Sequence, residues 1–273
     1  MGIVVQAIDQ ALEAGQDKEF RSHLGASSIG EACPRKIWYA FRWATPVTFK
    51  ASTLRLFNRG HLEEDRFVGW LRQAGVTVYQ ENPETGKQFR FIGYKGHYGG
   101  EIDGVGVGVL PGAPYLLEFK THNEKSFKDL VSNGVEMSKP THYIQMQMYM
   151  GEYKLTRALY LAIDKNSDNL YDEVVAFNKT VYTKYLERAK HIVDAVEPPP
   201  KINTSPSWYE CKWCDHHGVC HLKAPPAKNC RTCCHSTPVG NSQWVCEKSQ
   251  PHSVIEKDLM KTGCQSYVAH PME

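Results

Sequence analysis

Two short segments carry acids and a lysine at a spacing that could do metal-assisted hydrolysis. Residues 100–104 contain Asp103, residues 115–121 contain Glu118 and Lys120, and a loop with a Pro-Gly pair separates the two segments. We interpret them as adjacent strands. Because side chains alternate along a strand, Glu118 and Lys120 share one face while the residue between them points into the core. If Asp103 lies across from them, two carboxylates converge and could bind a hard divalent cation, beside which the ammonium could orient water or stabilise developing negative charge.

An acid-x-Lys tripeptide alone is weak evidence, since exposed strands carry such pairs as cross-strand salt bridges. Its neighbours in the chain favour the functional interpretation. Gly60-His61-Leu62-Glu63-Glu64 precedes the acids, and Gln145-Met146-Gln147-Met148-Tyr149 follows the lysine. In this order the motifs resemble the PD-(D/E)XK nucleases, particularly the RecB-like branch that includes the CRISPR-associated exonucleases and helicase-nuclease subunits.

The resemblance implies six catalytic residues: Glu64, Asp103, Glu118, Lys120, Gln145 and Tyr149. Asp103 and Glu118 would bind Mg²⁺ or Mn²⁺ with help from Glu64, and Lys120 would support the attacking water. This set predicts hydrolysis of DNA phosphodiester bonds. The preference for an exonuclease over an endonuclease, and for single-stranded DNA, comes from the resemblance alone.

Two positions of this set carry alternatives. Family members often have histidine where this chain has Glu64, so His61 or Glu63 is the alternative residue if the helix is read in another register. By resemblance, Gln145 would orient the catalytic groups and Tyr149 would line the DNA channel. The alternative for these two is a helix at the edge of the core, whose methionines are core residues.

Cysteine usage is the strongest anomaly of composition. Eight of the nine cysteines lie from Cys211 onward, which indicates metal binding rather than a disulfide framework. A C-x2-C-x5-C run and one distant cysteine could hold zinc or a 4Fe-4S cluster. The resemblance implies the 4Fe-4S cluster, because the iron-sulfur members of this branch share the arrangement, and its ligands would be Cys33, Cys211, Cys214 and Cys220. The alternative is a free Cys33 beside a zinc site completed by His216, His217 or His221.

The last cysteines predict a second site, for Zn²⁺. Cys230-Arg-Thr-Cys233 has the spacing of a metal knuckle, and Cys246 and Cys264 could complete a tetrahedral set. Cys234 is the odd one out, and possible replacement ligands are His235 and His270. A tail of about 50 residues has too little hydrophobic core to fold without such a metal site. Its role could be stability, DNA contact or binding of a protein partner.

Composition excludes few other classes. The hydrophobic fraction of 41%, the charged fraction of 23% and the net charge of +2 are those of an ordinary globular protein. No apolar run approaches the ~20 residues of a membrane span, and the N-terminus lacks a basic n-region, so we expect a cytoplasmic protein, in a host cytoplasm if it is phage-encoded. Residues 17–60 hold eight Lys or Arg against three acids, a possible DNA contact, interleaved with aromatics that we expect in the core: Trp38, Tyr39, Phe41 and Trp43.

Hydrophobic periodicity predicts an α/β fold with a mixed central sheet flanked by helices, as in a restriction-endonuclease-like core. Expected helices span residues 3–15, 28–43 (capped by Ser27 or Ser28), 52–74, 124–133, 140–153 and 180–196. Expected strands span 76–80, 88–92, 101–109, 115–121, 158–163 and 173–177. We predict a nuclease domain over residues 1–224 and a cysteine-rich zinc module over 225–273.

The leading hypothesis is therefore a metal-dependent DNA exonuclease, with oligomeric state open. A second class is a non-catalytic nucleic-acid-binding module that keeps the fold and its structural metal sites. A third is a zinc-dependent interaction protein in which the acid-x-Lys is an ordinary salt bridge. The presence of all the acids together with the lysine favours the first.

Overall fold

The computed structural model describes residues 2–17 and 19–272, so Lys18, which belongs to the basic stretch above, lies outside the described residues. The chain forms two compact units. The first comprises Met1–Asp17, Thr48–Phe91 and Gly100–Tyr185, and the second comprises Lys18–Val47, Ile92–Gly99 and Leu186–Glu273. The predicted boundary between residues 224 and 225 falls within the second unit and stays a prediction.

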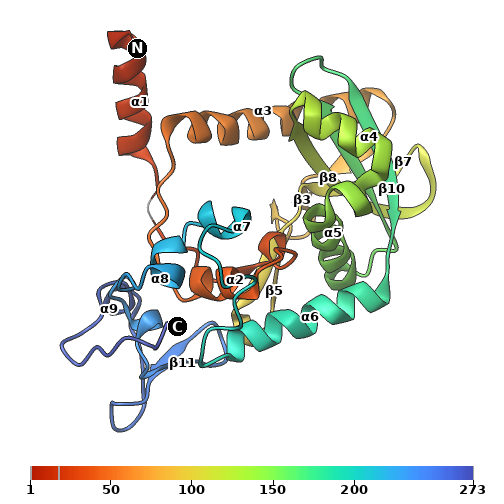
Figure 1. Cartoon of the computed structure of the whole chain (residues 1–273). Helices are drawn as coiled ribbons and strands as arrows, with labels where there is room; N and C mark the ends of the chain where they lie inside the picture. The colour runs from red at the N-terminus through yellow and green to blue at the C-terminus, as the bar shows by residue number, and fades with distance from the viewer. Residues whose placement is uncertain (1, 18, 273) are drawn as a thin grey trace. The chain divides into compact units, whose positions relative to one another are not determined.

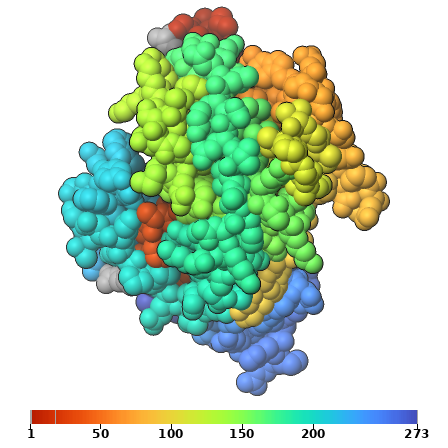
Figure 2. Space-filling model, turned by 90° about the vertical axis from the view of Figure 1, so that its right-hand side faces the viewer, coloured from red at the N-terminus to blue at the C-terminus, as the bar shows by residue number. Residues whose placement is uncertain are grey.

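The first unit contains a five-stranded sheet in the order β10-β9-β8-β7-β2. Its strands are β2 (Thr77–Tyr79), β7 (Gly104–Gly108), β8 (Leu110–His122), β9 (Arg157–Asp164) and β10 (Leu170–Ala176). β8 pairs with β9 in parallel and the other pairs are antiparallel. The expected mixed sheet is thus confirmed. β10 is an edge strand, and the side of this unit that carries it faces the viewer in Figure 2.

Helices cover both faces of this sheet. α3 (Ala51–Gln73) packs on one face, where Phe67 stacks on Phe119 with ring centroids 5.1 Å apart and Leu117 joins the same cluster. α4 (Glu124–Ser138) and α5 (Pro140–Tyr153) contact β8 and β9, and Figure 1 shows both helices near the β8 label. The face that carries Glu118 is therefore a helix-covered interior rather than an open surface.

The remaining helices and strands of the chain are short apart from two. α1 spans Ile3–Gly15 and contacts α3, and α6 spans Lys179–Asp194. The others are α2 (Pro34–Phe41), α7 (Tyr209–Lys212), α8 (His217–His221), α9 (Lys257–Thr262), β1 (Leu24–Gly25), β3 (Glu81–Asn82), β4 (Lys87–Gln88), β5 (Arg90–Gly93), β6 (Tyr98–Glu101), β11 (Ser236–Pro238), β12 (Trp244–Cys246) and β13 (Ser253–Val254). In the described part of the chain, no helix is both long and apolar enough to cross a membrane.

One expected helix is wrong in its start. The structure begins α2 at Pro34 rather than at residue 28, because Cys33 is extended at ψ 110° and proline favours the first helical position. Ser28 does not cap this helix and instead donates a hydrogen bond of 2.9 Å to the carbonyl of Gly25. The aromatic side chains from Trp38 to Trp43 are buried, as expected for core residues.

Candidate active site

Three side chains meet on the interior face of β8. Glu118 is fully buried and forms an ion pair with Lys120, two residues further along the same face. The Lys120 ammonium also donates 3.1 Å to the Phe119 carbonyl. From α5, the Gln145 amide donates 2.8 Å to Oε1 of Glu118. The strand alternation thus places the acid and the lysine together, and α5 adds the glutamine.

Asp103 lies beside this pair. It precedes β7, whose Gly104 is in register with Leu117 of β8. Its Oδ2 accepts a hydrogen bond of 2.7 Å from the backbone N–H of Phe119. The carboxylate is therefore fixed on the residue between Glu118 and Lys120, and the expectation that Asp103 lies across from them agrees with this geometry.

The structure distinguishes the three candidates on α3. Glu63 is buried and accepts two hydrogen bonds, of 2.9 and 2.8 Å, from Arg66. His61 has a side chain 77% exposed to solvent, with Nδ1 at 3.6 Å from Glu64. Glu64 is electrostatically linked to the cluster: burial raises its pKa, Asp103 raises it further, and Lys120 opposes the rise. These contacts are consistent with the register that assigns Glu64.

The cluster carries an excess of negative charge. Burial raises the pKa of Glu118 to about 7 against the opposing effect of Lys120, and Asp103 and Glu64 add to the rise. Burial alone would lower the pKa of Lys120, but the three carboxylates outweigh it and raise that pKa. One ammonium among three carboxyl groups leaves the site short of positive charge.

One oxygen of Glu118 also lacks a hydrogen-bonding partner in the part of the chain that the structure describes. Oε2 is buried and has no hydrogen-bond partner among the described residues. An unpaired buried carboxylate oxygen is costly unless a cation or a donor reaches it. Carboxylate oxygens are the ligands that hard divalent cations prefer, so the donor chemistry of Asp103, Glu118 and Glu64 fits Mg²⁺ or Mn²⁺. Nowhere in residues 2–17 and 19–272 are three His, Cys, Asp or Glu side chains already converged in a metal-holding group.

A cavity of about 610 Å³ adjoins the cluster within the first unit. Its wall includes Glu64 and Lys120 together with polar side chains outside the motifs, namely His122, Ser126, Lys139 and His142. Tyr149 is not part of this wall; it is buried in the core with its ring 6.0 Å from that of Phe91. Two polar residues of the wall lie on the same faces as motif residues. His122 is two residues after Lys120 on β8, and His142 is three residues before Gln145 on α5.

The first set of cysteines lies together in the second unit, and all nine cysteines of the chain are free thiols. Burial raises the pKa of Cys211, and the nearby Cys220 and Cys33 raise it further. Burial likewise raises the pKa of Cys214, with Cys33 adding to the rise. Cys33, distant in sequence, is therefore close to the C-x2-C-x5-C thiols. The His217 ring is hydrogen-bonded to the Cys211 carbonyl at 2.9 Å rather than to a thiol.

The second set lines a small cavity of about 30 Å³, and its four members are Cys230, Cys233, Cys246 and Cys264. Burial raises the pKa of Cys230 to about 11, with contributions from Cys264, Cys233 and Cys246 in that order. His235 also lines this cavity, whereas Cys234 does not. His270 is buried and hydrogen-bonded to Arg42 at 3.1 Å. The four thiols that the spacing selected thus line one cavity, although they do not converge as a metal-holding group in the described residues.

No family model matches the sequence, and no curated protein matches it significantly. The chain is similar to the crystal structure of SSO0001, with 14% identity, a TM-score of 0.47 and coverage of 82% of this chain and 98% of that one. It is also similar to an alkaline exonuclease from Laribacter hongkongensis, at 14% identity, TM-score 0.46 and coverage of 67% and 90%. The complex of that exonuclease with dAMP gives 14% identity, TM-score 0.45 and coverage of 68% and 90%. These are partial likenesses, and none assigns an activity to this chain.

Proposed function

We propose that the protein is a metal-dependent DNA nuclease of the PD-(D/E)XK type, acting as an exonuclease. The observation that carries the proposal is the ion pair of the buried Glu118 with the half-buried Lys120, beside Asp103 and Glu64 and next to a cavity of about 610 Å³. A surface salt bridge would be exposed and would lack the additional acids. Here the pair is enclosed by helices, carries an unpartnered oxygen, and borders a space large enough for a nucleotide.

Each residue has a distinct task in this proposal. Asp103, Glu118 and Glu64 hold Mg²⁺ or Mn²⁺, and the bound ion would supply an activated water and counter-charge for the phosphoryl group. Lys120 orients the attacking water and stabilises charge on the phosphorane. Gln145 holds the carboxylate of Glu118 in place through its 2.8 Å hydrogen bond.

Digestion of end-labelled single- and double-stranded DNA with Mg²⁺ or Mn²⁺ tests the proposal. Wild-type protein should release nucleotides from ends, and Lys120→Ala should lose at least about 10²-fold in rate, as expected when one transition-state donor is removed. The matched control is Lys128→Ala, because Lys128 lies on α4 of the same unit and forms only an exposed pair with Glu124. Normal activity in Lys120→Ala would refute the mechanism, and DNA binding without cleavage by wild type would favour a non-catalytic module.

We further propose that Cys33, Cys211, Cys214 and Cys220 hold a 4Fe-4S cluster. The proposal is supported by the effects of Cys220 and Cys33 on the pKa of Cys211, and of Cys33 on the pKa of Cys214. Protein purified without oxygen should show broad visible absorbance and contain iron and sulfide, and Cys211→Ser should lose both. A colourless, iron-free wild-type preparation would contradict this assignment.

The remaining cluster, Cys230, Cys233, Cys246 and Cys264, we propose as a structural Zn²⁺ site. Four thiols around one small cavity match the preferred ligand number of zinc. Metal analysis should find zinc in wild type, a loss of it in Cys230→Ser, and no loss in the control Cys234→Ser. Equal zinc content in the two variants would contradict the assignment.

A further inference from the structure

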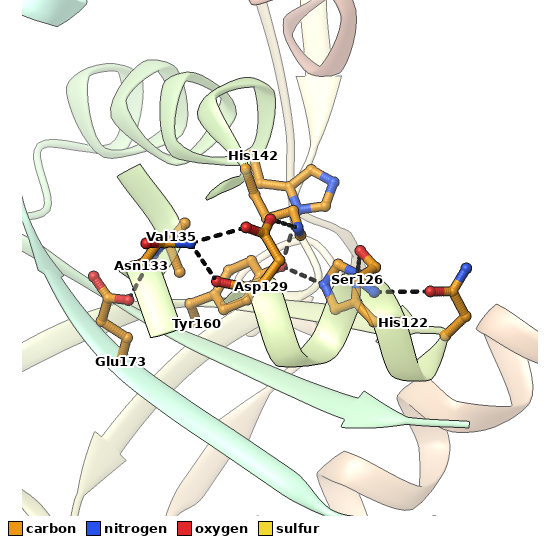
Figure 3. Close-up of polar contacts among 10 residues, drawn as sticks. His122, Ser126, Asp129, Asn133, Val135, His142, Tyr160 and Glu173 are labelled. Atoms are coloured by element: carbon orange, nitrogen blue, oxygen red, sulfur yellow. Dashed lines mark hydrogen bonds and ion pairs between the residues drawn. The ribbon is translucent and has the colours of Figure 1, made fainter. Parts of the chain in front are cut away.

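A chain of hydrogen bonds runs beside the acid cluster on the same face of β8. His122 Nε2 and His142 Nδ1 each lie 2.9 Å from the hydroxyl of Tyr160, and His122 Nδ1 lies 3.1 Å from Ser126 Oγ (Figure 3). Tyr160 belongs to β9 and is in register with Glu118. The chain therefore connects β8, β9, α4 and α5; His122 shares β8 with Glu118, and His142 shares α5 with Gln145.

Counting hydrogens allows this chain two directions. Burial lowers the pKa of His122 to about 4 and that of His142 to about 3, so each ring is neutral and carries one N–H. The hydroxyl of Tyr160 has one hydrogen, so it donates to one ring and accepts from the other. In one direction Ser126 donates to His122, His122 donates to Tyr160, and Tyr160 donates to His142. This direction leaves one N–H free to donate, at Nε2 of His142, whereas the opposite direction makes that atom an acceptor and leaves the Ser126 hydroxyl as the free donor.

That Nε2 atom is open to the cavity. His142 lines the cavity, and its only hydrogen bond in the described structure is the one through Nδ1. Nε2 is also absent from the buried polar atoms that lack a partner, so it reaches solvent. A donor at this atom is available to a molecule in the cavity.

Lysines lie around the two rings, and two of them are paired with acids. Besides burial, Lys120 and Lys139 lower the pKa of both histidines, and Lys165 acts on His122 in the same direction. Lys139 is paired with Asp129 at 2.9 Å and Lys120 with Glu118, so this positive charge is partly balanced. Phosphate oxygens accept from neutral and cationic donors alike. A neutral donor has the further advantage that it does not repel a divalent cation held by the nearby acids.

Resting on the proposed function, we propose that Nε2 of His142 donates a hydrogen bond to a non-bridging phosphate oxygen of the nucleic-acid strand, and that Tyr160 and His122 are positioning residues that hold this donor uncharged and aimed. Through this hydrogen bond, Nε2 of His142 recognises the phosphate backbone of the strand at the proposed site. It carries no base specificity, because a phosphate oxygen is the same in every nucleotide.

Binding of a labelled short single-stranded oligonucleotide tests the proposal, with Ca²⁺ in place of Mg²⁺ so that affinity is measured without cleavage. His142→Phe should weaken binding about tenfold, the size of a hydrogen bond to a charged group. His142→Gln, whose amide can donate from nearly the same place, should recover part of the loss. Tyr160→Phe keeps the aromatic ring but removes the hydroxyl that orients His142, so it should weaken binding by a smaller factor. Circular dichroism and thermal unfolding verify that each variant folds.

A single methylphosphonate, which replaces one non-bridging oxygen by a methyl group, separates recognition from a structural role. Scanned along the strand, it should weaken wild-type binding at one position in particular, and this penalty should disappear in His142→Phe. An undiminished penalty in that variant, while wild type still cleaves DNA in Mg²⁺, overturns the inference and leaves the nuclease proposal intact. If wild type binds but never cleaves, and the penalty does disappear, the inference stands and the nuclease proposal fails. If wild type binds no DNA, both are refuted.

Discussion

Replacing Glu118 by glutamine should stabilise the metal-free protein at alkaline pH and abolish its response to divalent cations. In the folded protein the pKa of Glu118 rises from its ordinary 4.5 to about 7, chiefly because the side chain is buried. At ~1.4 kcal/mol per pH unit, this rise corresponds to about 3 kcal/mol. Glutamine has the same shape, can still accept from Lys120, and has no charge to bury.

The sign follows from proton linkage. Between pH 4.5 and about 7 the folded protein binds the Glu118 proton while the unfolded chain releases it. The free energy of unfolding therefore falls as pH rises through this window, and the full cost of about 3 kcal/mol is present above it. The buried histidines His122 and His142 act oppositely, because their lowered pKa values cost stability as pH falls. The difference between wild type and Glu118→Gln cancels their effect and isolates Glu118.

Urea unfolding in EDTA, followed from about pH 5 to about pH 8, measures this difference. Glu118→Gln should gain stability relative to wild type as pH rises, by up to about 3 kcal/mol, with part of the gain offset by a weaker partner for Lys120. Adding Mn²⁺ should then stabilise wild type and leave the variant unchanged, since ligand binding stabilises only a protein that holds the ligand. A parallel pH dependence in the two proteins would refute the reasoning, because Glu118 would then not be the buried acid that titrates.

Four further variants test neighbouring contacts. Glu64→Gln should lose Mn²⁺-dependent stabilisation. Glu63→Gln should keep it and unfold more easily, because the pair with Arg66 is lost. The reverse pattern would assign Glu63 to the site in place of Glu64. Gln145→Leu should lower kcat about tenfold or more with little change in KM, because Glu118 loses its orienting donor, and a change confined to KM would argue against that role. Gly104→Ala should lower stability by about 1–3 kcal/mol by thermal unfolding, because a Cβ there would lie 2.8 Å from the Tyr79 carbonyl oxygen; an unchanged Tm would contradict this.

Strand alternation made the relation between Glu118 and Lys120 predictable from the sequence, because the side-chain period of a strand is fixed by backbone geometry. The helices α1 and α5 were also predictable from the sequence, and their bounds agree with the expected ranges. The start of α2 was not predicted. Ser28 looked like a helix cap, but proline at residue 34 sets the first turn, and the serine bonds back into the preceding loop.

Burial of the site could not be deduced in the same way. A strand pattern shows which residues share a face but not whether helices cover it, so the change of Glu118 from a charged side chain into an acid with a pKa of about 7 depends on tertiary packing. The choice of Glu64 over Glu63 has the same origin. Both positions suit a helix, and only the Arg66 pair and the proximity of Asp103 separate them.

Tyr160 lies between the acid cluster around Glu118 and the hydrogen-bonded histidines His122 and His142. Its ring lies in register with Glu118 and its hydroxyl joins His122 to His142, while burial and the carboxylate of Glu118 raise its pKa well above the ordinary range. The hydroxyl therefore keeps its proton at neutral pH. A proton that cannot leave can only change its acceptor, so Tyr160 can reverse the direction of the hydrogen-bond chain without adding charge beside the acids. An anion in the cavity would select the direction that presents the donor at His142, and a cation at the acids would not oppose it.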